Sequence, residues 1–394
     1  MTRPIASALA LTLTLTAPHW AHAQQGAPDG EWPSYGGDLG HTRYSALDQI
    51  DAENFNELEL AWRFSTENLG PGPEYIFQST PLMVDGVLYS TGGTRRAVVA
   101  LDASTGELLW LHRLNEGERG ATAPRRLSGR GLTYWDDGGD GVIFYVTPGY
   151  QLIGLNAQTG RRLDGFGENG LIDLKQNMDQ DLGPLAEVGL HAAPLIADGV
   201  IVIGAAHLAG VAPTTKEKPK GHIRGYDART GERKWIFHTI PDADEFGNES
   251  WGADSWRFTG YTGVWGQMTM DPELGYVYLP VEMPTGDLYG GHRPGDNLFA
   301  DSIVALDIQT GERVWHYQTI HHDVWDFDLP SAPILADITV DGRSIKAVAQ
   351  PSKQGFLYVL DRTNGEPVWP IEERAVPQSD VPGEITSPTQ PFPT

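Results

Sequence analysis

One ten-residue pattern returns along the chain and constrains its fold more than any other feature. It reads LDASTGELLW at 101–110, YDARTGERKW at 226–235 and LDIQTGERVW at 306–315, and looser copies begin at positions 155 and 360. Five copies at an irregular spacing of some tens of residues indicate a repeat architecture.

Each copy has the sequence of a strand, a tight turn and a second strand. In the first copy, Asp102 closes one strand and its carboxylate can accept hydrogen bonds from turn amides, while Gly106 supplies the positive φ of a short hairpin loop. Trp110 then falls on the next strand, where we expect it to pack against a neighbouring sheet.

A second set of signals precedes the repeats. The sequences TPL at 80–82, APL at 193–195 and API at 332–334 each start a predicted strand, and Asp-Gly pairs at 85–86 and 198–199 turn into the strand that follows. Four short antiparallel strands per unit, joined by turns, form a propeller blade. We therefore predict an all-β fold, a β-propeller with roughly five blades in this chain.

Both ends of the predicted propeller are expected to be open. Trp62, in the sequence LAWRF at 60–64, reads as the last strand of a blade whose beginning is missing. This is expected if an N-terminal strand closes the ring by completing the final blade. Because residues 387–394 have a loop-like sequence with no finishing strand, we expect a wedge of a larger ring.

Composition limits the chemistry and the partners. The 394 residues are 40% hydrophobic, enough for a large core, and 47 glycines with 28 prolines favour many turns over long helices. The absence of cysteine excludes disulfides, thiolate metal sites and a covalently attached haem, so any redox chemistry must use a bound cofactor. The formal net charge of −24 argues against nucleic acid or an anionic membrane surface as a partner.

Residues 1–23 are predicted to be a secretory signal peptide, and residues 24–394 an incomplete propeller. Arg3 supplies the positive start, residues 5–17 are an apolar run, and Ala21-His22-Ala23 is a small-x-small cleavage site. The run is shorter than the roughly 20 residues that span a bilayer. We therefore predict a periplasmic protein with no transmembrane segment in its mature chain.

Charged and aromatic residues crowd together near the C-terminal end. The sequence HHDVWDFD at 321–328 holds Asp323, Asp326 and Asp328, and Lys353 follows a later short strand. A carboxylate and a lysine held at two strand ends could face one bound ligand. The alternative is a surface loop whose acids cap turns, but the neighbouring histidines and tryptophan favour a site.

These motifs carry a family resemblance. The tryptophan repeat, WPSYGG at 32–37, HHDVWDFDLP at 321–330 and PSKQGFLYVLDRTNGEPVW at 351–369 resemble the quinoprotein dehydrogenases that use pyrroloquinoline quinone (PQQ), most nearly the membrane-type glucose dehydrogenases. The resemblance covers 31–394. It implies a propeller of eight blades around the quinone, of which this chain resembles the N-terminal part.

The resemblance also implies roles for individual residues. Oxidation of an alcohol by hydride transfer needs a base, a cation that polarises the quinone and a flat surface that holds it. Asp326 matches the family's general base, Lys353 the basic residue that contacts the quinone oxygens, and Trp265 the tryptophan under the ring. Trp265 could instead be a packing residue. Arg95 and Arg96 could pair with the cofactor's carboxylates or be solvated surface arginines.

The family resemblance further implies a divalent metal ion, calcium or magnesium, or a lanthanide ion. Where the family carries an acidic or amide ligand, this chain has His207, a poor ligand for a hard cation. A second ligand position falls at Thr285, for which Asp287 could substitute. Asp328 is a further candidate ligand, unless it is a strand-end acid satisfied by backbone amides.

Two classes of function remain open from the sequence. The first is a glucose-dehydrogenase-like enzyme that uses PQQ to oxidise an alcohol or aldose sugar and passes electrons to a membrane quinone or a cytochrome. The second is a non-catalytic propeller scaffold or an inactive truncated enzyme. The pair of Asp326 and Lys353 favours the enzyme, because a scaffold has no use for it.

Overall fold

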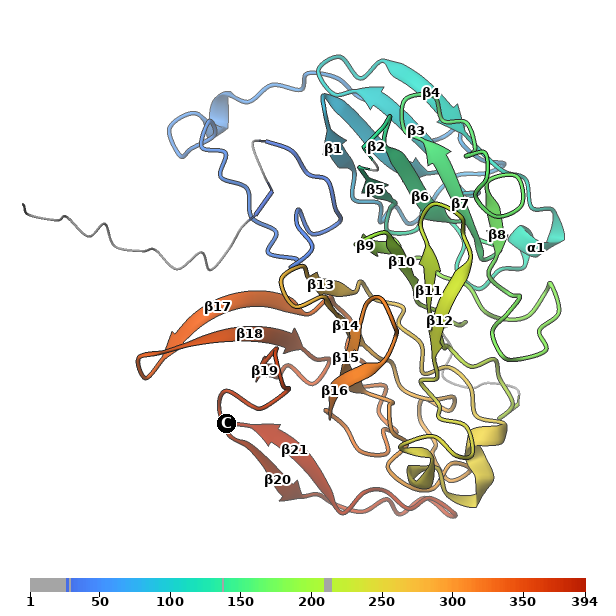
Figure 1. The fold of residues 1–394 in the computed structure, drawn as a ribbon, viewed down its shortest axis with the longest axis vertical. Coiled ribbons are helices and arrows are strands. Elements are labelled where there is room, and N and C mark those ends of the chain that lie inside the picture. The colour runs from blue at the N-terminus through green and yellow to red at the C-terminus, as the bar shows by residue number, and fades with distance from the viewer. Residues whose placement is uncertain (1–25, 28–29, 137, 209–214) are drawn as a thin grey trace, which may run out of the picture.

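The computed structural model describes residues 26–27, 30–136, 138–208 and 215–394. The predicted signal peptide lies outside these residues. In the described part, antiparallel sheets follow one another around an arc, in chain order (Figure 1). The all-β propeller predicted from the repeats is confirmed.

Four sheets have four strands each, and a shorter sheet and a hairpin follow them. The first sheet contains β1 (Leu82–Val84), β2 (Val87–Gly92), β3 (Ala97–Asp102) and β4 (Leu108–His112). The second contains β5 (Thr133–Trp135), β6 (Val142–Val146), β7 (Gln151–Asn156) and β8 (Leu171–Asp173). The third contains β9 (Leu195–Ala197), β10 (Val200–Ile203), β11 (Ile223–Asp227) and β12 (Arg233–Phe237). The fourth contains β13 (Thr269–Asp271), β14 (Tyr276–Pro280), β15 (Ser302–Asp307) and β16 (Arg313–Gln318).

The fifth sheet has three strands, β17 (Ile334–Val340), β18 (Arg343–Pro351) and β19 (Leu357–Asp361), and β20 (Ile371–Ala375) pairs only with β21 (Thr389–Pro393). The helices are short: η1 (Phe55–Glu57), α1 (Glu118–Ala121), η2 (Asn248–Ser250) and η3 (Gly252–Arg257). Among the described residues, no helix has the length and apolar character needed to cross a membrane. Four complete blades with further strands agree with the predicted count of roughly five.

Tryptophans of the repeat join the first blade to the second, the third to the fourth and the fourth to the fifth, as their pattern predicts. The indole Nε1 of Trp110, on β4, donates to the carbonyl oxygen of Ala157 in the second blade, at 2.8 Å. Trp235, on β12, donates to Ile308 in the fourth blade at 2.9 Å, and Trp315 makes the corresponding bond to the fifth blade. The same repeat therefore supplies both partners of the contact: the tryptophan of one copy and the turn of the copy in the next blade.

The glycine of the repeat is required twice over. Gly311 has a φ of +73°, and a Cβ added to it would lie 2.5 Å from the ring of Trp235. Positive φ is strained for residues with a side chain. Any other residue here would strain the turn and collide with the docked tryptophan.

The structure corrects two expectations about the ends of the propeller. The sequence predicts a loop with no strand at 387–394, but Thr389–Pro393 form β21, which pairs with β20. Residues 60–64 carry no strand pairing in the structure, although the sequence predicts the last strand of a blade. The reason is that no described strand lies beside them to form a ladder. Trp62 still docks, since its Nε1 donates to Ala103 at 3.1 Å. By contrast, Trp369, the tryptophan of the repeat copy that begins at position 360, is not docked in this way among the residues that the structure describes and is 46% exposed.

The hydrophobic core is divided among neighbouring sheets. One buried cluster joins Phe144 of the second sheet to Ile201 of the third, and another joins Val202 of the third to Val277 of the fourth. A sheet between two others thus packs its two faces against the sheets on either side. Binding sites are therefore expected in the loops at the sheet ends.

The segment that carries the WPSYGG motif crosses the inner strands. Trp32 pairs with Met83 of β1, while the carbonyls of Leu39 and Gly40 accept from the amides of Met270 in β13 and Leu335 in β17. This N-terminal segment connects the first blade to the fourth and fifth. It also lines a cavity of about 720 Å³ beside the inner strands.

Candidate functional site

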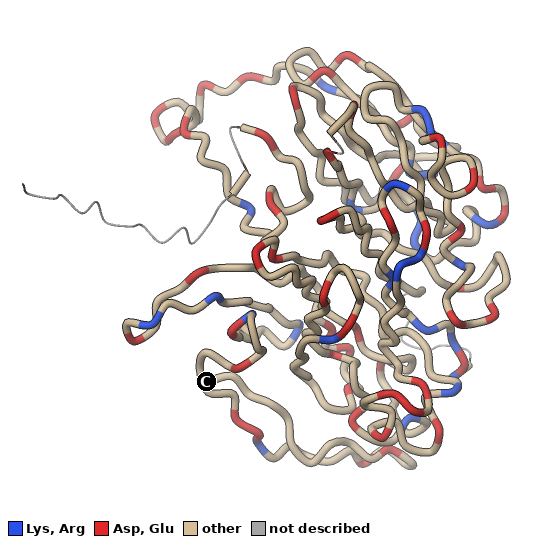
Figure 2. The backbone as a smooth tube through the Cα atoms, in the orientation of Figure 1, with Lys and Arg blue, Asp and Glu red and all other residues tan. Residues whose placement is uncertain are grey.

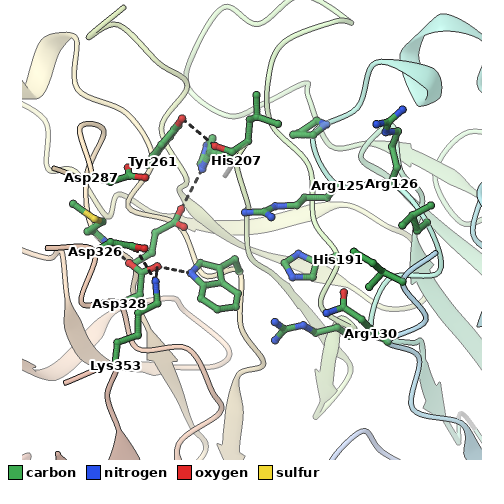
Figure 3. Close-up of a pocket in the computed structure, with 18 of the residues that line it drawn as sticks. Arg125, Arg126, Arg130, His191, His207, Tyr261, Asp287, Asp326, Asp328 and Lys353 are labelled. Carbon is green, nitrogen blue, oxygen red and sulfur yellow. Dashed lines mark hydrogen bonds and ion pairs between the residues drawn. The ribbon is translucent and has the colours of Figure 1, made fainter. Parts of the chain in front are cut away.

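A second cavity, of about 770 Å³, lies among loops from several blades (Figure 3). Its walls come from the loop before β5, the segments that follow β10 and β14, the loop before β13, the loop between β16 and β17, and the turn after β18. The charged residues of these walls are Arg125, Arg126, Arg130, Glu282, Asp287, Asp326, Asp328 and Lys353. Segments far apart in the sequence therefore converge here.

The predicted pair of Asp326 and Lys353 meets in this cavity. Lys353 Nζ donates to Asp326 Oδ1 at 2.7 Å and to Asp328 Oδ2 at 3.1 Å. The same Asp328 oxygen accepts from Trp265 Nε1 at 3.0 Å. Asp328 Oδ1 accepts from the amide of Met283 at 2.9 Å. One buried carboxylate thus fixes both the lysine and the indole (Figure 3).

Asp323 shapes the loop that presents these carboxylates. It is buried, and its two oxygens accept from the amides of Trp325 at 2.8 Å and Phe327 at 2.7 Å. Asp326 has a φ of +57°, a conformation that aspartate tolerates better than most residues. The tight loop turns the Asp326 carboxylate towards Lys353 instead of into the core.

The crowded acids perturb one another. Burial raises the pKa of Asp328 to about 7, with a further contribution from Glu282. Burial and the charge of Asp326 raise the pKa of Asp287 to about 6. Burial alone would lower the pKa of Lys353, but Asp328 and Asp326 outweigh burial and raise it. At neutral pH the lysine is therefore a cation held by two carboxyl groups.

The opposite wall is aromatic and basic. The ring of His191 lies parallel to that of Trp265, with 9° between the planes and 6.0 Å between the centroids. The Arg130 guanidinium lies 5.0 Å from the centre of the Trp265 ring. A flat conjugated anion would find a planar surface and a cation together here.

Glu282 is a carboxylate of the cavity that the sequence analysis missed. It follows β14, and its Oε1 accepts from the amide of Gly263 at 3.0 Å and contacts His207 Nδ1 at 3.1 Å. Its position just beyond a buried strand is the signal that could have indicated it. His207 lines the cavity but is held by this carboxylate.

Three predicted site residues lie elsewhere. Arg95 is exposed and does not line the cavity. Arg96 is buried and donates only to backbone carbonyls, including Val146 and Leu190 at 2.7 Å. Thr285 is buried, and its Oγ1 accepts from the amide of Gly260 at 3.1 Å. The arginines that do line the cavity are those of the sequence RRLSGRG at 125–131. Three arginines within six positions were a stronger indication of an anion site than the pair Arg95-Arg96.

The predicted metal ligands are only partly brought together. Asp328 and Asp287 line the cavity, whereas Thr285 does not. Among the described residues, one group of three brings its ligand atoms within 4.8 Å of one another, and it is His238, Asp242 and Glu245, outside this cavity. The cavity carboxylates are spaced more widely.

Comparison with known proteins accounts for this combination of propeller and cavity. The PQQ family described as glucose/ethanol/alcohol dehydrogenase, beta-propeller domain, matches residues 32–394. The chain belongs to this family. The resemblance read from the motifs is confirmed.

Individual relatives agree. The chain is 36% identical over 397 residues to quinoprotein glucose dehydrogenase of Escherichia coli (strain K12), covering 94% of this chain and 47% of the relative. It is 34% identical over 390 residues to quinate/shikimate dehydrogenase (quinone) of Acinetobacter baylyi, covering 91% and 46%. A solved structure of a europium-containing methanol dehydrogenase matches with a TM-score of 0.72 at 25% identity, covering 93% of this chain and 62% of that one. The chain spans about half the length of the curated relatives it matches.

Proposed function

We propose that this chain provides the cofactor and substrate cavity of a PQQ-dependent dehydrogenase that oxidises an alcohol or an aldose sugar. The observation that carries the proposal is the bridge from Lys353 Nζ to Asp326 and Asp328 beside the Trp265 indole. Membership of the PQQ family supports the same reading.

The residues of the cavity fit PQQ, a planar tricyclic tricarboxylate. Trp265 offers a flat surface on which such a ring can stack, and His191 extends that surface in a parallel plane. Arg130, above the indole, offers charge to a carboxylate, and Lys353 offers an ammonium group to a quinone oxygen. When bound, PQQ supplies the two-electron acceptor for a hydride.

Asp326 is the general base in this proposal. Its side chain is partly exposed to the cavity and is paired with Lys353. An alcohol that places its hydroxyl at Asp326 gives the hydroxyl proton to this carboxylate as the hydride leaves the carbinol carbon. Lys353 stabilises negative charge on the acceptor oxygen, and Asp328 holds the lysine in place through its own ion pair.

A divalent cation fits the acid side of the cavity. Glu282, Asp287, Asp326 and Asp328 line one cavity, and burial together with the neighbouring carboxylates raises the pKa values of Asp287 and Asp328. Carboxylate oxygens are the preferred ligands of calcium and magnesium. Of the predicted ligands we keep Asp328 and Asp287 and replace Thr285 with Glu282. The europium-containing methanol dehydrogenase shows that a similar propeller can hold a metal ion.

We further propose that electrons from the reduced cofactor pass to a membrane quinone or a cytochrome and that the protein is periplasmic. The secretory signal peptide predicted at residues 1–23 supports the periplasmic location. A non-catalytic scaffold gives no reason to bring a lysine, two aspartates and an indole into one cavity.

Titration of the purified chain with PQQ tests the proposal. With calcium or magnesium present, we expect saturable quenching of tryptophan fluorescence, which Trp265→Leu weakens by at least tenfold. Trp369→Leu is the control, because this exposed tryptophan lies outside the cavity. Dye-linked alcohol oxidation should require both PQQ and the metal ion. Absence of saturable PQQ binding, or oxidation that persists without either addition, contradicts the proposal.

A further inference from the structure

Two walls of opposite charge face each other across the cavity (Figure 3). The acids Glu282, Asp287, Asp326 and Asp328 lie on one side, and three arginines of the loop before β5 lie on the other. Figure 2 shows Asp and Glu residues along the whole backbone, and the sequence has 52 of them against 28 Lys and Arg, for a net charge of −24. Four cationic side chains in one cavity therefore stand out in a chain with this excess of acidic residues.

The cations of the cavity differ in whether they have partners. Lys353 is paired with Asp326 and Asp328, and Arg130 lies over Trp265. In the described part of the chain, the Arg125 side chain forms no hydrogen bond or ion pair. Its Nε is buried without a partner. Burial lowers the pKa of Arg125, and the charges of Glu282 and Asp328 only partly offset this effect.

The backbone holds Arg125 in a fixed place. Arg96, fully buried, donates from Nη2 to the Arg125 carbonyl at 2.8 Å and from Nε to the Leu127 carbonyl at 3.1 Å. The amide of Arg130 donates to the His191 carbonyl at 2.7 Å. Arg96, predicted as a cofactor ligand, is instead a positioning residue for this loop. A loop held by Arg96 thus presents to the cavity a partly buried guanidinium whose Nε is buried without a partner.

A buried charge without a partner destabilises a protein unless a ligand supplies the opposite charge. A guanidinium matches a carboxylate in shape and can bind it with two hydrogen bonds. An anionic substrate is therefore oriented, with its carboxylate at Arg125 and its hydroxyl towards Asp326.

We infer that the substrate is a hydroxy acid, an alcohol or polyol that carries a carboxylate, and that Arg125 is its specificity-determining residue. This inference rests on the proposed function for the hydroxyl end of the substrate. The rival occupant of Arg125 is a carboxylate of PQQ. The substrate is favoured because the Arg125 side chain points across the cavity towards the side of Asp326 and Asp328 (Figure 3), whereas Arg130 already covers the Trp265 platform.

Matched pairs of ligands test the inference. Gluconate and sorbitol, and likewise glycerate and glycerol, differ by a carboxylate in place of a hydroxymethyl group. Calorimetric titration of the protein, with PQQ and magnesium present, should give the acid at least a tenfold higher affinity than its neutral partner. Added salt should reduce that preference. Equal affinities for acid and neutral partner overturn the inference.

Arg125→Gln should remove the tenfold preference and leave the affinity for the neutral polyol unchanged. Arg95→Gln is the charge-matched control, because Arg95 is exposed and outside the cavity, and it should keep the preference. If Arg125→Gln instead weakens PQQ binding by a similar factor, Arg125 holds the cofactor and the inference is wrong while the proposed function stands. If the parent protein binds no PQQ, the proposed function fails, and the matched pairs still decide whether the cavity prefers anions.

Discussion

At the scale of single residues, the site depends on groups whose neighbours were not visible in the sequence. The motifs at 321–328 and 351–369 indicated Asp326 and Lys353, and the two residues meet at 2.7 Å. The motif at 321–328 misleads about His322, whose Nδ1 contacts the carbonyl oxygen of Gly295. Sequence crowding thus located the loop, but only the fold separates residues that face the cavity from residues that hold the loop.

Arg96 illustrates the limit of such reasoning. A strand-end arginine before an apolar strand can be a ligand or a structural donor, and the four carbonyls it reaches come from residues 29 to 94 positions away. No local pattern encodes those contacts. Glu282 was missed for the same reason, because its role depends on loops from other blades.

Asp326→Asn tests the general base directly. Asparagine accepts the positive φ of this position and keeps the shape of the side chain, but it cannot take the substrate proton. We expect turnover with PQQ and metal bound to fall by about a hundredfold or more, while PQQ affinity changes little. Steady-state rates and a PQQ titration measure the two effects. Near-normal turnover would assign the base to another residue.

At the scale of elements, the tryptophan repeat made the fold readable. The Asp of the repeat accepts from turn amides, as in Asp102 with Thr105 at 2.8 Å, and three of the repeat tryptophans dock on the next blade. These contacts are local or recur from blade to blade, so the pattern predicts them. The prediction of a strand at 60–64 was wrong because a strand also needs a neighbouring strand to pair with, and a local pattern does not reveal that neighbour.

The turn glycines allow a matched pair of substitutions. Gly311→Ala and Gly275→Ala both place alanine at a φ near +72°, but the added Cβ meets the Trp235 ring only at Gly311 and open space at Gly275. The strained backbone should cost about 1–2 kcal/mol in each variant. Overpacking against the indole should cost about 1–3 kcal/mol more in Gly311→Ala. Denaturant unfolding measures both. Equal losses of stability would show that tryptophan docking leaves room for a side chain.

At the scale of the whole molecule, buried titratable groups set how stability depends on pH. Burial lowers the pKa of His41 and of His316 to about 4, and those of His191 and His222 lie well below their usual range. At these four histidines the unfolded chain therefore holds more protons than the folded protein up to about pH 7.5, one unit above the unfolded pKa. The free energy of unfolding rises with pH through that interval because of these histidines.

Buried carboxyl groups act in the opposite direction. Asp301 is fully buried, neither of its carboxylate oxygens has a hydrogen-bond partner among the described residues, and its pKa is raised well above the usual range by burial and by Asp323 and Asp328. The pKa of Asp328 itself is raised to about 7. Between the unfolded and folded pKa values the folded state holds more protons, so stability falls as pH rises.

The histidines still contribute to the slope just above pH 6.5, so the carboxyl effect is measured as a difference between two proteins that share them. Asp301→Asn keeps the size of the side chain and cannot ionise. With EDTA present, the free energy of unfolding of the parent protein relative to that of Asp301→Asn should fall from pH 6.5 to pH 8, by up to about 1.4 kcal/mol per pH unit for one carboxyl group that stays protonated only in the folded state. Added magnesium should recover more stability at pH 8 than at pH 6, because only ionised carboxylates bind it. Denaturant unfolding across this interval measures both effects. Equal slopes in the parent protein and Asp301→Asn would mean that Asp301 is ionised in the fold and has a counter-charge.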